Sequence, residues 1–161
     1  MSTARPEPRL VECPALHVVG VGGTFTPASA PTGIPPLWSA FWARHAEVQH
    51  VVPGRCYGFS TCPERLDASL PPQFEYVACF GVTDTSDVPA GMVARTAPAG
   101  RYLVFTHEGH ISGFQQTLAH IAEWIEASPY ERAPTPDYEL YDERFRAETM
   151  DGAFDVYVPV R

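Results

Sequence analysis

The sequence has few basic side chains. Only 11 of its 161 residues are Lys or Arg, against 19 Asp or Glu, and the formal net charge is −8. The arginines are scattered along the chain and do not form a cluster. Because binding to phosphate groups requires clustered Lys and Arg, this composition disfavours a nucleic-acid partner. An acidic surface instead raises the local concentration of cations.

Long apolar runs are also missing. No stretch reaches the roughly 20 apolar residues that span a bilayer, and residues 1–9 lack the apolar segment of a secretory signal. These nine residues are polar and proline-rich, which predicts a disordered tail. The four cysteines include no Cys-x-x-Cys pair, and Cys56 and Cys62 lie too far apart on an extended strand to form a disulfide. We therefore expect a cytoplasmic protein with reduced thiols and no membrane contact.

Motifs for metal, phosphate and nucleophilic chemistry are absent or incomplete. His107-Glu-Gly-His110 lacks the His-x-x-x-His spacing of a helical zinc site, and no third ligand is visible. Gly20-Val-Gly-Gly23 lacks the Gly-Lys-Ser/Thr ending of a phosphate loop. Ser60 and Ser112 have no accompanying His and Asp pattern that indicates a catalytic triad. The sequence thus predicts no metal and no cofactor.

What is present is the composition of a folded domain. The chain is 45% hydrophobic and 12% aromatic, which is enough for one core. We predict a single domain over residues 10–161. Apolar periodicity predicts two helices, and a capping box at Ser112 and Gln115 marks the start of the second. The expected helices are 34–45 and 112–128, and the expected strands are 10–21, 56–61, 74–82, 92–97, 101–107, 138–145 and 154–160.

The two halves of the chain, residues 10–83 and 92–161, match element by element. Tyr57-Gly-Phe-Ser60 aligns with Tyr138-Glu-Leu-Tyr141, and Phe74-Glu-Tyr-Val77 aligns with Phe154-Asp-Val-Tyr157. Both alignments are offset by about 80 residues, which indicates one repeated unit of strand, helix, strand and strand. The sequence therefore predicts an α+β fold of two pseudo-symmetric repeats. The cleft between such repeats is a natural ligand site.

One position of this alignment is asymmetric. The second half has Glu139 and Tyr141 where the first half has Gly58 and Ser60. On an extended strand Glu139 and Tyr141 share a face. A carboxylate beside a phenol, opposite small side chains, suits an organic cation or a polar aromatic ligand. The alternative is an ordinary half-exposed sheet face with solvated acids.

Three features together resemble the GyrI-like family of effector-binding domains. They are Pro98-Ala-Gly-Arg-Tyr-Leu-Val-Phe-Thr-His-Glu-Gly109, a helix that ends at Trp124-Ile125 before Tyr130, and Tyr138-Glu-Leu-Tyr141 followed by Val156-Tyr-Val-Pro-Val160. The resemblance covers residues 10–161, and its specific motifs lie in the second half. It implies a curved antiparallel sheet with helices on one face and a ligand channel on the other.

The resemblance also implies a function. Glu139 would contact a lipophilic cationic or polar aromatic ligand, with Tyr141, Tyr157 and Tyr102 stacking on it. Such domains serve as ligand sensors of AraC-type and MerR-type regulators, so a regulator is a possible protein partner. Two alternatives stay open. One is a hydrolase of cyclopropane-bearing alkylating compounds, with Glu139 as general base and Tyr141 orienting a water. The other is an interaction protein that inhibits a topoisomerase such as gyrase.

Overall fold

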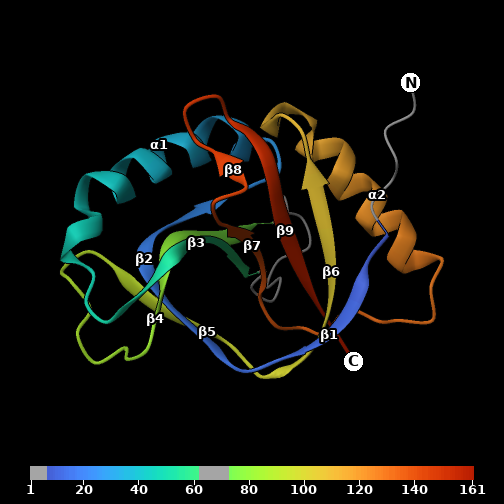
Figure 1. Ribbon diagram of the computed structural model, residues 1–161, viewed down its shortest axis with the longest axis horizontal. Helices are drawn as coiled ribbons and strands as arrows, with labels where there is room; N and C mark the ends of the chain where they lie inside the picture. The colour runs from blue at the N-terminus through green and yellow to red at the C-terminus, as the bar shows by residue number, and fades with distance from the viewer. Residues whose placement is uncertain (1–6, 62–72) are drawn as a thin grey trace.

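The computed structural model describes residues 7–61 and 73–161, and the path of the chain can be followed in Figure 1. The elements are β1 (Arg9–Cys13), β2 (Leu16–Phe25), α1 (Ala30–Arg44), the 3-10 helix η1 (His45–Glu47), β3 (Val51–Thr61), β4 (Phe74–Val82), β5 (Val93–Ala97), β6 (Gly100–Glu108), the 3-10 helix η2 (Ile111–Gly113), α2 (Phe114–Glu126), β7 (Asp137–Tyr141), β8 (Phe145–Arg146) and β9 (Asp151–Val160). None of the helices in these residues is long and apolar enough to cross a membrane.

The strands form an antiparallel sheet whose order is symmetric about its middle. The order is β1-β6-β9-β7-β3-β4-β2-β5, and β8 pairs with β9 outside this path. From the centre outwards, β7-β9-β6 on one side corresponds to β3-β4-β2 on the other. Each of these halves runs strand, helix, strand, strand along the chain. The predicted α+β class and its pseudo-symmetric arrangement are therefore confirmed.

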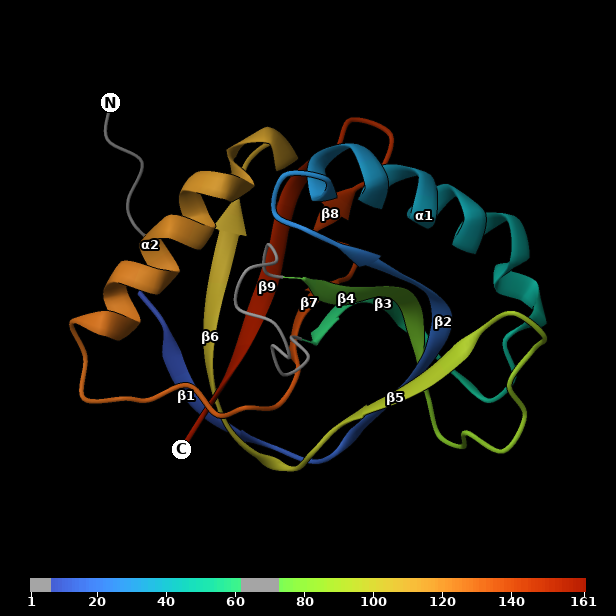
Figure 2. The ribbon, with the colours of Figure 1, turned by 180° about the vertical axis from the view of Figure 1, so that it is seen from behind.

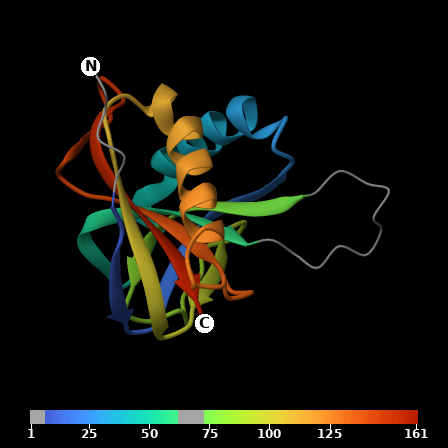
Figure 3. The ribbon, with the colours of Figure 1, turned by 90° about the vertical axis from the view of Figure 1, so that its right-hand side faces the viewer.

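Both helices pack on the same face of the sheet (Figures 1 and 3). Phe41 of α1 packs with Val19 and Ala78, whereas Ile121 of α2 packs with Phe105. These strand residues face the helices because side chains alternate along a strand, so that every second one points to the helix-bearing face.

The opposite face encloses an all-strand cluster. Its buried members are Val18, Tyr57, Phe59, Val77, Cys79, Ala97, Tyr102, Tyr138 and Leu140. Val11 of β1 and Val93 of β5 pack against the same cluster, although these strands are the two edges of the sheet. Contact of both edges with one cluster requires the sheet to curl, as Figure 2 shows. The helices therefore lie outside the curl and this cluster lies inside it.

Several predicted boundaries were wrong. The predicted strand 10–21 and helix 34–45 leave a connection at 22–33, but β2 continues to Phe25 and α1 starts at Ala30, so the connection is only 26–29. Pro31 is compatible with this early start, because the first turn of a helix needs no amide donors there. The predicted capping box at Ser112 does not form: Gly113 is the N-cap of α2, and the Ser112 amide donates to Nδ1 of His110 at 3.0 Å.

The predicted strand 138–145 and the predicted tail 1–9 also differ from the structure. The predicted strand 138–145 is interrupted because Asp142 Oδ1 accepts a hydrogen bond from the Arg144 amide at 3.1 Å, which forms a turn between β7 and β8. Arg9, predicted to be in the tail, begins β1. The rest of that prediction, for residues 1–6, lies outside the described residues, and so do Cys62 and the remainder of the segment 62–72 between the predicted strands 56–61 and 74–82.

Candidate functional site

Glu139 lies at the centre of the sheet, in the middle of β7. Its neighbour on β3 is Gly58, and its neighbour on β9 is Val156. Val156 belongs to the cluster that packs under α2, so Glu139 is on the helix-bearing face. This placement differs from the expectation that the ligand channel would lie on the face opposite the helices. Because β7 and β3 are the central strands, Glu139 is located where the two halves of the fold meet.

The carboxylate of Glu139 accepts two hydrogen bonds from phenols. Tyr141 donates to Oε1 over 2.6 Å and Tyr76 donates to the same oxygen over 3.0 Å. In the part of the chain that the structure describes, Oε2 accepts no hydrogen bond. The Tyr76 oxygen in turn accepts a hydrogen bond from Nε1 of Trp38 at 3.1 Å. One oxygen of the carboxylate is thus held by two phenols, and no described residue donates a hydrogen bond to the other.

Burial dominates the electrostatics of this group. Glu139 keeps some accessible surface, but the surrounding protein raises its pKa from an ordinary 4.5 to about 7. The two phenol hydrogen bonds oppose this rise, and the negative charge of Asp137 adds to it. Burial likewise raises the pKa of Tyr76 and of Tyr141 well above 10, so both phenols remain protonated donors. Near neutral pH the carboxyl group is therefore balanced between its charged and neutral forms.

Aromatic rings surround the carboxylate on the helix side. The Trp38 indole of α1 packs edge-on against Tyr141, with ring centroids 5.8 Å apart, and against Tyr76 at 6.5 Å. Tyr141 also packs on Phe154 of β9, with ring centroids 4.6 Å apart. The rings come from both halves of the fold, and together they form an apolar wall around one acid.

Gly58 has a steric role in this arrangement. A Cβ at this position would lie 2.0 Å from the Tyr76 oxygen and 2.8 Å from Oε1 of Glu139. Contacts this short would force the phenol away from the carboxylate. The space that glycine leaves in β3 is therefore filled by the hydroxyl group of Tyr76.

The predicted site residues separate into two groups. Ser60 pairs with Asp137 in β7 and with Tyr76 in β4, so it lies on the same face as Glu139 and Tyr141. Tyr102 and Tyr157 lie on the other face, in and against the all-strand cluster inside the curl. The structure therefore does not bring these two tyrosines together with Glu139. The alternation along β6 and β9 fixes this separation.

Tyr157 and Tyr102 pack around Tyr138 on that inner face. Tyr157 stacks on Tyr138 with ring centroids 4.7 Å apart, and the Tyr102 hydroxyl donates to the Pro98 carbonyl at 2.7 Å. These contacts account for the burial of Tyr102 and Tyr138 as part of a core.

Sequence reasoning missed Tyr76 and Trp38. Tyr76 lies in the predicted strand 74–82 and Trp38 in the predicted helix 34–45, and neither was named as a site residue. The sheet register also shifts the alignment of β4 with β9 by two residues. Gly58 pairs with Ala78 and its counterpart Glu139 pairs with Val156, so Ala78 corresponds to Val156. Tyr76 thus corresponds to Phe154, and both contribute a ring to the site. The only sequence signal for Tyr76 is its spacing of two residues from Ala78, which places both side chains on the same face of the strand.

The two histidines of the His107-Glu-Gly-His110 motif have protein partners. Nδ1 of His107 lies 2.7 Å from the Thr117 hydroxyl oxygen, and Nε2 lies 3.1 Å from the His110 carbonyl oxygen. His107 is buried beside Phe154, with ring centroids 4.9 Å apart. In residues 7–61 and 73–161, no group of three or more His, Cys, Asp or Glu side chains is placed to hold a metal ion.

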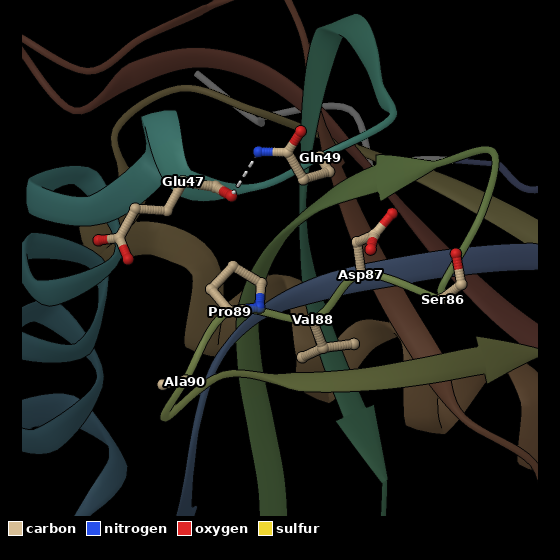
Figure 4. A pocket seen from close by; sticks show the side chains of 7 residues that line it. All are labelled: Glu47, Gln49, Ser86, Asp87, Val88, Pro89 and Ala90. Atoms are coloured by element: carbon tan, nitrogen blue, oxygen red, sulfur yellow. Dashed lines mark hydrogen bonds between the residues drawn. The ribbon is translucent and has the colours of Figure 1, made fainter.

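A surface hollow of about 490 Å³ lies elsewhere, between η1 and the loop before β5 (Figure 4). It is lined by Glu47, Gln49, Ser86, Asp87, Val88, Pro89 and Ala90. None of the predicted site residues is among them. This hollow is shaped by loop and surface side chains and is distinct from the Glu139 site.

Comparison with known proteins identifies the family. The sequence model of the GyrI-like small molecule binding domain matches residues 6–161. The chain belongs to this family. It is 35% identical over 159 residues to the transcriptional regulator BrlR of Pseudomonas aeruginosa. The match covers 94% of the chain but 54% of BrlR, so this GyrI-like chain spans about half the length of that relative.

Solved structures have the same fold. SAV2435, solved bound to tetraphenylphosphonium, has a TM-score of 0.76 at 19% identity and matches 96% of this chain and 94% of its own. An integron cassette protein of Vibrio cholerae has a TM-score of 0.69 at 21% identity and matches 96% and 95%. EcmrR, solved in a complex with DNA, has a TM-score of 0.68 at 16% identity and matches 99% and 59%. The expectation that the present GyrI-like chain does not itself contact DNA stays a prediction.

Proposed function

We propose that this GyrI-like chain binds lipophilic organic cations at Glu139. The observation that supports this is a single acid held among aromatic rings, with one carboxylate oxygen bonded to two phenols and the other oxygen without a bond from the described residues. An organic cation gains both from a carboxylate and from ring faces. Tyr141, Tyr76 and Trp38 are the rings within reach of such a ligand.

The ligand class agrees with a relative. SAV2435 was solved with tetraphenylphosphonium, a permanent cation surrounded by phenyl rings. A cation of this kind carries no hydrogen-bond donor, so its recognition must rely on charge and on apolar contact. The site around Glu139 offers both, which supports the same class of ligand for this chain.

The similarity to BrlR supports a role in regulation. That relative is a transcriptional regulator, and this chain matches about half of it. We propose that this chain senses or sequesters drug-like cations, and that any DNA-reading part belongs to another protein segment or partner. An acidic chain with a net charge of −8 is compatible with such a division of tasks.

Calorimetric titration with tetraphenylphosphonium tests the proposal. We expect Glu139→Gln to weaken binding by about tenfold or more, because it removes the charge while keeping the shape of the side chain. Glu148→Gln is the matched control, since Glu148 is an exposed acid in the turn before β9, and it should leave the affinity unchanged. Equal affinity of the Glu139 variant and the wild type would remove Glu139 from the role.

Hydrolysis is the second candidate, favoured by one specific observation. A carboxyl group with a pKa of about 7 is suited to act as a general base near neutral pH. In this alternative Glu139 takes a proton from a water, oriented by Tyr141, as the water oxygen bonds to a cyclopropane carbon. The strained ring C–C bond breaks, its electron pair passes to the conjugated carbonyl group of the alkylating compound, and that group is protonated in the hydrated product. Mass analysis after incubation with a cyclopropane-bearing alkylating compound separates the candidates. A hydrated product formed by the wild type, and not by Glu139→Gln, would establish turnover.

A further inference from the structure

A second carboxylate lies beside Glu139 on the same strand face. Asp137 and Glu139 are two positions apart in β7, where they face Ser60 and Gly58 of β3. Residues two apart on one strand share a face and are separated by about 7 Å. The negative charge of Asp137 acts on Glu139 strongly enough to raise its pKa. The two acids are therefore close enough to repel each other when both are ionised.

Among the described residues, Asp137 forms a long ion pair with Arg132. Its Oδ2 lies 3.8 Å from Nη1 of Arg132, which is longer than a hydrogen bond. The Arg132 side chain is 47% exposed and that of Asp137 is 35% exposed. An ion pair this long, with an arginine side chain that is only half covered, contributes little, typically below about 1 kcal/mol. A ligand cation could therefore replace Arg132 at small cost.

The geometry points to a preference for dications. We propose that Asp137 is a second cation-binding carboxylate of the Glu139 site, so that the site selects ligands carrying two positive charges joined by a short spacer. This inference rests on the proposed function. A monocation neutralises one of the two acids and leaves the other beside it, whereas a dication removes their mutual repulsion. The residues opposite on β3, Gly58 and Ser60, are uncharged, so Arg132 is the competing cation among the described residues.

Ethidium and propidium form a matched pair of probes. They share one phenanthridinium ring, and propidium adds a quaternary ammonium on a three-carbon linker. Fluorescence titration gives the affinity of each dye for the wild type and for Asp137→Asn. We expect the variant to bind propidium about tenfold more weakly and ethidium less than about threefold more weakly, as a partly screened charge pair predicts.

Two further variants sharpen the test. Asp87→Asn removes the same charge from an exposed loop acid that lines the hollow in Figure 4, and it should leave both affinities within about twofold. Arg132→Gln removes the cation that competes for Asp137, so it should strengthen propidium binding by a few-fold and leave ethidium binding unchanged.

The outcomes separate this inference from the function on which it rests. If ethidium binding depends on Glu139 and Asp137→Asn weakens both dyes equally, or neither, the preference for dications is refuted and the proposed function stands. If neither dye binds, or if Glu139→Gln leaves ethidium binding unchanged, both proposals are overturned. A selective loss of propidium affinity in Asp137→Asn supports both.

Discussion

The raised pKa of Glu139 predicts that the protein becomes less stable as the pH rises. The ordinary pKa of 4.5 applies to the unfolded chain, and the folded value is about 7. Between these values the unfolded chain releases a proton that the folded protein keeps, so stability is full below pH 4.5 and falls until the pH passes 7. At 1.36 kcal/mol per pKa unit, the loss amounts to about 3 kcal/mol.

The variant Glu139→Gln isolates this effect, because its amide does not titrate in this range and its carbonyl oxygen can still accept from Tyr141 and Tyr76. Unfolding in urea at pH 5 and pH 8 measures the difference between variant and wild type. We expect the free energy of unfolding of the variant to gain about 2.5 kcal/mol on that of the wild type between these pH values, which corresponds to about 5–10 °C in Tm.

Other titrating groups affect both proteins, and Asp137, whose pKa burial raises to about 6, contributes with the same sign. Subtracting the free energy of unfolding of the wild type from that of the variant cancels most of the effect of these other groups. Glu148→Gln controls for the loss of one surface charge. Parallel pH profiles for wild type and Glu139→Gln would refute the burial of the carboxyl group in the folded protein.

Two further predictions concern the groups around the carboxylate. Gly58→Ala places a methyl group 2.0 Å from the Tyr76 oxygen, so we expect a loss of stability of about 1–3 kcal/mol in urea unfolding. Gly100→Ala, where an added Cβ meets no atom within 4 Å, should be nearly neutral, and equal effects of the two changes would contradict the steric argument. Tyr141→Phe removes the 2.6 Å hydrogen bond that lowers the pKa of Glu139. Titration with tetraphenylphosphonium from pH 5 to 9 should then show the onset of tight binding at a higher pH than in the wild type, whereas an unchanged onset would exclude this role for the phenol.

Local patterns were sufficient for much of the fold. The strand 74–82 was predicted with its bounds, and the α+β class with its two matching halves followed from the order of elements and from the family resemblance. The predicted element boundaries were wrong where a side chain hydrogen-bonds to a nearby backbone amide. Asp142 turns the chain after β7, and His110 takes the amide of Ser112 that a capping box would have used.

The sequence by itself determined that Glu139 and Tyr141 share a face, because alternation along a strand is local. It also indicated that Gly58 is the counterpart of Glu139 in the other half. Only the tertiary structure decided which face the helices cover, and that Tyr76, 63 residues earlier, reaches the same carboxylate oxygen. The physical reason is that strand pairing and helix packing are set by contacts between distant segments. No local pattern specifies which phenol meets which acid across the sheet.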